Sequence, residues 1–126
     1  MIENLDSYSL FSLLLHYFGV TDSSSDSSYE FNMLVIQGLV KKDINSTYYV
    51  LTKKGEEIIE RLSDSDKLHL ILYYQSNIVR LVRKYKMVED FVVNLDKSCL
   101  STFLANENSI IRQSALWIFN YSKEMI

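Results

Sequence analysis

The chain has 126 residues, 48% of them hydrophobic and 23% charged, with a formal net charge of −3. This length fits one domain or a small module with an extension, and so high an apolar content excludes a disordered chain. Proline is absent and glycine occurs three times, which favours long helices over a fold of many tight turns.

The first helix is expected from about Ser7 to Phe18, with Asp6 or Ser7 as its N-cap and Gly19 as its C-cap. Its apolar residues cover most of its circumference, which predicts a central buried helix or one that partly forms a dimer contact. The uncharged stretch around it is too short to span a bilayer, and it follows acidic residues, unlike the hydrophobic part of a signal peptide. We therefore expect a soluble, cytoplasmic protein that does not bind membranes.

A polar loop over residues 21–28, rich in serine and aspartate, separates the first helix from a second helix at about 29–37. Gly38 is expected to end this second helix. Its buried side is predicted from apolar residues at i, i+3 and i+4 spacing, which are Phe31, Leu34 and Val35.

Tyrosine and β-branched residues then predict a β-hairpin, with strands at about 39–43 and 48–51 joined by a turn at Asn45-Ser46. Thr52 is a preferred N-cap residue and is expected to begin a third helix. The buried stripe of this third helix is predicted to consist of Ile58, Ile59 and Leu62.

Helices are expected to fill the rest of the sequence after a polar break at residues 63–66. One long helix is predicted from about 65 to 86, followed by helices at about 87–95 and 97–104. The apolar face of the long helix consists of Ile78, Leu81, Val82 and Tyr85, and its opposite face of Arg80, Arg83 and Lys84. A last helix at about 110–123 is apolar nearly all round, so we expect it to be enclosed or shared with a second subunit, with Trp117 and Phe119 as contact residues.

Two short motifs surround the predicted hairpin. Gly38-Leu39-Val40 follows the second helix, and Tyr49-Val50-Leu51-Thr52 is followed by Gly55 and Ile58. This pattern resembles winged-helix regulators, in which the recognition helix ends in a Gly-Leu-Ile/Val step and the wing leaves through Tyr-x-Leu-Thr-x-x-Gly-x-x-Ile/Leu. In such a frame Gly38 lets the chain turn out of the helix, Thr52 caps the next helix, and Gly55 lets that helix pack closely against the wing.

The resemblance covers residues about 29–62, a quarter of the chain. It implies a winged-helix-like module over residues 1–63, followed by a helical extension over 64–126 that serves dimerisation or partner docking and packs with the module as one unit. The expected fold class is therefore mainly α with a small β-hairpin. The implied function is that of a DNA-associated transcriptional regulator, expected as a homodimer.

Two features of the sequence depart from winged-helix proteins that read DNA. The serine-rich loop leaves too little chain for the short helix and turn that precede the recognition helix in those proteins. The recognition helix offers Asn32 and Gln37 to bases, but it contains Glu30 and no lysine or arginine, and it follows Asp22 and Asp26. DNA phosphates would repel these carboxylates.

Basic side chains that could contact phosphates lie elsewhere in the sequence. Lys41, Lys42, Lys53 and Lys54 flank the predicted wing, and Arg80, Arg83 and Lys84 lie on the predicted long helix. If the two groups align, they would form a positive stripe suited to contact with the DNA backbone. If they do not align, each group is a solvated face.

Two classes of function therefore remain open. The first is a DNA-associated regulator that contacts the backbone through its wing. The second is a protein–protein interaction module, such as a phage-type inhibitor, an adaptor or an immunity-like protein, whose acidic face of Asp22, Asp26 and Glu30 binds a basic protein surface. No enzyme, metal site or cofactor is expected, because one cysteine, two isolated histidines and the lack of a phosphate loop or nucleophile motif provide no catalytic set.

Overall fold

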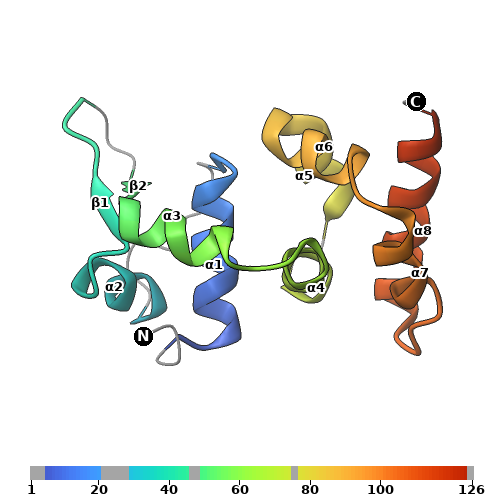
Figure 1. Cartoon of the computed structure of the whole chain (residues 1–126), viewed down its shortest axis with the longest axis horizontal. Coiled ribbons are helices and arrows are strands. Elements are labelled where there is room, and N and C mark those ends of the chain that lie inside the picture. The colour runs from blue at the N-terminus through green and yellow to red at the C-terminus, as the bar shows by residue number, and fades with distance from the viewer. Residues whose placement is uncertain (1–4, 21–28, 46–48, 75–76, 125–126) are drawn as a thin grey trace. The chain divides into compact units, whose positions relative to one another are not determined.

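The computed structural model describes residues 5–20, 29–45, 49–74 and 77–124 (Figure 1). Over these residues the fold is mainly helical, with one two-stranded antiparallel sheet. The predicted fold class, mainly α with a small β-hairpin, is therefore confirmed. The chain forms two compact units, Met1–Ser63, named unit 1, and Asp64–Ile126, named unit 2.

Unit 1 contains the first helices and the hairpin, drawn in blue to green in Figure 1. Its elements in chain order are α1 (Ser7–Tyr17), α2 (Tyr29–Ile36), β1 (Val40–Lys42), β2 (Tyr49–Leu51) and α3 (Lys53–Glu60). The Asp6 side chain caps α1 by accepting a hydrogen bond from the Ser9 amide at 2.8 Å. α1 packs against α2, α3 and β2 and is the central helix of the unit, as its apolar sequence predicted. Its buried apolar residues are Phe11, Leu13, Leu14 and Leu15.

Glycine ends both of the first two helices. Gly38 has a φ of +74°, and the amide after it, on Leu39, donates to the Leu34 carbonyl at 2.9 Å. This arrangement provides a partner for a carbonyl at the helix end and buries Leu39, which is 1% exposed. Gly19, with a φ of +73°, ends α1 in the same way. Glycine suits both positions because other residues rarely adopt a positive φ.

The hairpin continues directly from the end of α2. Its antiparallel register pairs Val40 with Leu51, Lys41 with Val50, and Lys42 with Tyr49. Because side chains alternate along a strand, Tyr49 lies on one face of the hairpin, and Lys41 and Val50 lie on the other. Phe31 of α2 packs against the first face, with its ring centroid 4.9 Å from that of Tyr49. The predicted turn residue Ser46 lies outside the described residues.

Unit 2 is built from helices over its described residues, drawn in light green to red in Figure 1. Its elements are α4 (Asp64–Tyr74), α5 (Ile78–Lys84), α6 (Lys86–Val93), α7 (Lys97–Leu104) and α8 (Ser109–Glu124). α8 packs against α4, α6 and α7, and α5 packs against α6. The core between these helices includes Leu68, Ile71, Val88, Val92, Leu100, Ala115 and Ile118.

The single long helix predicted over residues 65–86 is wrong. α4 ends at Tyr74, and the Asn77 side chain caps a separate helix, α5, by accepting a hydrogen bond from the Arg80 amide at 3.0 Å. Asparagine side chains compete with the main chain for such bonds, which favours a helix start over a helix interior. Tyr85, with φ −116° and ψ 115°, is extended and separates α5 from α6. None of the described helices is long and apolar enough to cross a membrane.

The apolar sequence of α8 predicted a helix that is either enclosed on all sides or shared with a second subunit. In the structure α8 is not enclosed on all sides. Only one face of the helix is buried, and it consists of Ile111, Ala115, Ile118 and Ser122. Ile110 and Leu116 are 65% and 49% exposed. α8 therefore packs as an ordinary amphipathic helix, because the helices around it cover a single face.

Candidate functional site

The end of α2 and the start of α3 are joined by hydrogen bonds around Thr52. The Thr52 hydroxyl accepts from the Gly55 amide at 3.2 Å, which caps α3 as predicted, and it donates to the Gly38 carbonyl at 2.6 Å. The Thr52 amide also donates to the Leu39 carbonyl at 3.0 Å. One residue thus holds the entry and the exit of the hairpin together and sets the position of α2 relative to α3.

Gly55 is the point of closest approach between α3 and the hairpin. A Cβ atom added to Gly55 would lie 2.2 Å from the Leu39 carbonyl oxygen and 3.2 Å from Cδ2 of Leu51. Because the nearest atom belongs to the main chain, it cannot swing aside as a side chain could. The close packing predicted for Gly55 is confirmed.

Among its described side chains, the outward side of α2 exposes two apolar residues and one asparagine. Phe31 and Leu34 are buried as predicted, but Val35, which was expected to complete the buried stripe, is 38% exposed. On a helix of two turns the buried side centres between Phe31 and Leu34, and this turns Val35 outward. Ile36 is 75% exposed and Asn32 is also exposed. We name Asn32, Val35 and Ile36 the α2 face.

The four wing lysines are all exposed, but they do not share one surface. Lys41 and Lys42 are neighbours in β1 and therefore lie on opposite faces of the hairpin. The Lys54 ammonium donates to the Gln37 carbonyl at 3.3 Å and so occupies the C-terminal end of α2, where the helix dipole favours a cation. Lys53, at the start of α3, is exposed.

The basic residues predicted on the long helix lie on α5, in unit 2. Arg80, Arg83 and Lys84 are exposed, and all three project from the side of α5 opposite its buried Leu81 and Val82. The Arg83 guanidinium lies 6.0 Å from the centroid of the Trp117 ring. Arg83 is therefore already engaged with an aromatic side chain of its own unit.

The two aromatic residues expected to contact a partner also have contacts within unit 2. Trp117 stacks on Tyr121, with centroids 4.9 Å apart and ring planes 15° apart. The Lys97 ammonium lies 4.5 Å from the centroid of the Phe119 ring. Both aromatic side chains are half-buried, and their packing is part of unit 2 itself.

The acidic face predicted from the sequence falls mostly outside the described residues. Asp22 and Asp26 belong to the undescribed loop. The main chain of Glu30 lies in the first turn of α2, but its side chain is outside the described part of the structure.

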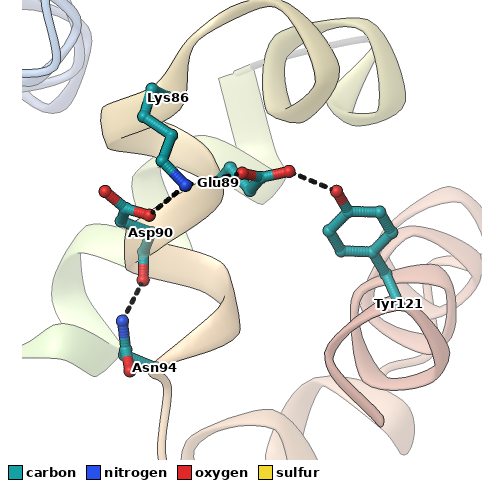
Figure 2. Close-up of polar contacts among 5 residues, drawn as sticks. All are labelled: Lys86, Glu89, Asp90, Asn94 and Tyr121. Atoms are coloured by element: carbon teal, nitrogen blue, oxygen red, sulfur yellow. Dashed lines mark hydrogen bonds and ion pairs between the residues drawn. The ribbon is translucent and has the colours of Figure 1, made fainter. Parts of the chain in front are cut away.

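A polar cluster between α6 and α8 was missed by sequence reasoning (Figure 2). The Tyr121 hydroxyl donates to Glu89, and the Lys86 ammonium contacts Glu89 at 3.1 Å and Asp90 at 3.0 Å. The Tyr121 hydroxyl, and after it the Lys86 ammonium, hold the pKa of the Glu89 carboxyl below its usual value. The same bond with Glu89 raises the pKa of Tyr121. Because Glu89 lies on α6 and Tyr121 lies on α8, their hydrogen bond links the two helices.

Replacing Tyr121 by phenylalanine is expected to lower the melting temperature most between about pH 5 and about pH 9. The folded-state pKa of Glu89 lies below the ordinary value of 4.5, so its stabilisation is present above that pH and is lost as the pH falls through the folded value. The folded-state pKa of Tyr121 lies above 10.0, so its stabilisation is present below that pH and is lost at higher pH.

Thermal unfolding of the wild type and of Tyr121→Phe, followed by circular dichroism across this pH range, measures the effect. The Asp90→Asn variant is the control, because it leaves the bond between Tyr121 and Glu89 in place. A melting difference between wild type and Tyr121→Phe that stays constant from acid to alkaline pH would contradict the assigned bond.

The two histidines of the chain, His16 and His69, lie in different units. His16 contacts the Ser12 carbonyl at 2.7 Å in unit 1, whereas His69 stacks on Tyr73 at 4.1 Å in unit 2. Burial, and after it Asp64 and Asp96, raise the pKa of the half-buried Cys99 thiol, which keeps it in its less reactive protonated form. Over the described ranges, no group of three His, Cys, Asp or Glu side chains could hold a metal ion.

Comparisons with known proteins add no relative to these observations. The chain matches no protein-family profile, no curated protein and no solved structure.

Proposed function

We propose that the chain is a non-enzymatic binding protein, whose unit 1 has a winged-helix arrangement and contacts another protein. The order α1, α2, β1, β2, α3 supports the winged-helix part, because it contains a helix that leads into a two-stranded wing and a helix that leaves it. Gly38, Thr52 and Gly55 supply the turn, the cap and the close approach that the resembling motif requires.

The α2 face is the observation that favours a protein partner. A helix that reads DNA in the major groove offers arginine, lysine, asparagine or glutamine to base edges and phosphates. α2 contains no basic residue, and its outward side exposes 75% of Ile36 and 38% of Val35. Exposed apolar side chains gain most by leaving water against another apolar surface, which a protein provides.

DNA contact is the second candidate, and the exposed lysines of the hairpin favour it. Lys41, Lys42 and Lys53 could reach phosphates without any contribution from α2. The chain would then be a DNA-associated regulator that binds the backbone through its wing, as a homodimer. Under either candidate we place the chain in the cytoplasm, where its single cysteine stays reduced.

A mobility-shift assay of the full chain with random-sequence duplex DNA separates the two candidates. If protein contact is the function, the DNA stays unshifted at about 50 mM salt, where phosphate contacts are strongest. The variant Lys41→Glu, Lys42→Glu tests the hairpin, and Lys97→Glu, Lys123→Glu in unit 2 is the matched control. A shift that weakens steeply toward about 200 mM salt, and that only the hairpin variant loses, would overturn the protein proposal.

A further inference from the structure

We infer that two copies of this chain associate through the basic side of α5 on one copy and the acidic side of α3 on the other, with the two helices antiparallel. This inference goes beyond the proposed function, because it concerns surfaces other than the α2 face. It is carried by the opposite charges of the two helix sides and by the matching spacing of their charged residues.

The basic side of α5, which we name the α5 face, consists of Arg80, Arg83 and Lys84, all exposed. α5 contains no carboxylate along its seven residues. Arg83 and Lys84 lie one helical turn after Arg80, on either side of the line that runs through it along the helix. The three cations therefore form a triangle, with one residue at its N-terminal end and two at its C-terminal end.

The acidic side of α3, which we name the α3 face, consists of Glu56, Glu57 and Glu60, all exposed. Glu56 and Glu57 lie one turn before Glu60, on either side of the line that runs through it along the helix. Lys53, one turn earlier, bounds the face at its N-terminal end. The three carboxylates form a triangle of the same shape, but its single residue lies at the C-terminal end.

An antiparallel alignment matches the two triangles. It sets the single cation against the single carboxylate, and the pair of cations against the pair of carboxylates. A parallel alignment would set one charge against two at each end of the contact. Antiparallel helices also bring their dipoles into a favourable arrangement. A second copy of the chain therefore supplies one carboxylate for each cation of the α5 face.

A half-buried aromatic ring borders each face. In unit 2 the Trp117 ring has its centroid 6.0 Å from the Arg83 guanidinium. In unit 1 burial, and after it Glu60 and Glu56, raise the pKa of the Tyr17 hydroxyl, which places this ring within electrostatic range of both carboxylates. Ion pairs formed beside such rings are less surrounded by water and salt than pairs in the open, and this strengthens them.

The contact depends mainly on charge, which sets its strength and its response to salt. Exposed ion pairs contribute little individually, so we expect a weak and reversible association. Its dissociation constant should rise at least about 10-fold between about 50 and about 500 mM salt, because salt screens exposed charges.

Sedimentation equilibrium of the full chain at about 50 mM salt, over a wide range of concentrations, measures this association directly. The variant Glu56→Gln, Glu57→Gln, Glu60→Gln is expected to raise the dissociation constant at least about 10-fold, because it removes every carboxylate of the α3 face. Glu107→Gln, Glu124→Gln, which removes two exposed carboxylates of unit 2, is the control and should leave the association unchanged. Far-UV circular dichroism checks that both variants keep the wild-type fold.

A charge reversal tests the pairing of these two faces. One variant carries Glu56→Lys, Glu57→Lys and Glu60→Lys, and the other carries Arg80→Glu, Arg83→Glu and Lys84→Glu. Each variant alone should be monomeric, because like charges then meet in the contact. All six changes in one chain leave the net charge as it is in the wild type and set opposite charges against each other again. This combined variant should associate as the wild type does.

Three results would overturn the inference: a wild-type chain that is monomeric at every concentration, an association indifferent to the glutamine changes on α3, or a folded combined variant that stays monomeric. The glutamine variant introduces no new charge, so it decides the matter even where the reversed helices fail to fold. All three results leave the proposed function standing, because none of these variants changes a residue of the α2 face. That function is overturned separately, by DNA binding that the hairpin lysines carry.

Discussion

Replacing Gly55 by alanine is expected to lower the free energy of unfolding of unit 1 by about 3 kcal/mol or more. The added Cβ would lie 2.2 Å from the Leu39 carbonyl oxygen, a main-chain atom that also accepts the Thr52 amide. Relief requires α3 to move away from the hairpin, and this movement weakens the bonds that Thr52 makes to Gly38 and Gly55. At an ordinary helix position the same change would instead stabilise the helix by about 0.5 to 1 kcal/mol, so the loss expected here comes from the close approach to the hairpin.

Hydrogen exchange measured by mass spectrometry is the suitable readout for Gly55→Ala, because it follows the peptides of α1, α2 and α3 separately from those of unit 2. Gly38→Ala is the control. Its added Cβ meets nothing within 4 Å, so its cost comes only from the φ of +74° and should be about 1 kcal/mol. Equal losses of protection in the two variants would contradict the close approach at Gly55.

Truncating Phe31 to alanine is the second change with a large expected effect, a loss of about 3 to 5 kcal/mol in the stability of unit 1. Phe31 is 2% exposed. Its ring is packed edge-on against Tyr49 of β2 at 4.9 Å and lies 5.5 Å from the His16 ring of α1. Removing the ring would weaken the packing among three elements of unit 1 at once, because α1, α2 and the hairpin all contact Phe31.

A double-mutant cycle distinguishes the aromatic contact from simple burial. Urea unfolding of Phe31→Ala, Tyr49→Ala and the double variant should give a coupling energy of about 0.5 to 1.5 kcal/mol. Asn32→Ala, the next residue along α2 and exposed, should change the stability by less than about 0.5 kcal/mol. Strictly additive losses from Phe31→Ala and Tyr49→Ala would mean that the two rings do not interact.

Features of unit 1 that depend on local main-chain geometry could be predicted from the sequence. Gly38, Thr52 and Gly55 each meet a requirement set by their near neighbours: a positive φ, a helix cap and a close approach to the hairpin. Few other residue types can end a helix with a positive φ, cap the next helix or allow a close approach to the hairpin. For the same reason the fold class followed from the pattern of apolar residues and helix breakers.

Contacts between residues far apart in the sequence could not be predicted. Nothing near Lys54 in the sequence shows that its ammonium meets the Gln37 carbonyl, and Glu89 gives no sign of the Tyr121 hydroxyl. These contacts matter for the candidate site, because they decide which charged groups are already engaged. They depend on how the helices pack, which periodicity alone does not determine.

The position of Val35 and the break at Asn77 were missed for a different reason. The sequence contained an indication of each feature, but each indication was compatible with two different structures. A valine next to a buried leucine can face inward or outward on a helix of two turns, and the direction depends on where α1 lies. An asparagine inside an apolar pattern can be a solvated helix residue or a cap, and at Asn77 the bond to the Arg80 amide selects the cap.

The placement of Trp117 determines what optical spectroscopy can detect in this protein. It is the only tryptophan of the chain, and in unit 2 it stacks on the Tyr121 ring and lies 6.0 Å from the Arg83 guanidinium. Tryptophan fluorescence will therefore report the packing of α8, because α2 contains no tryptophan. Ile44, which is 96% exposed in the hairpin, is a position where a second tryptophan would make unit 1 visible without disturbing its core.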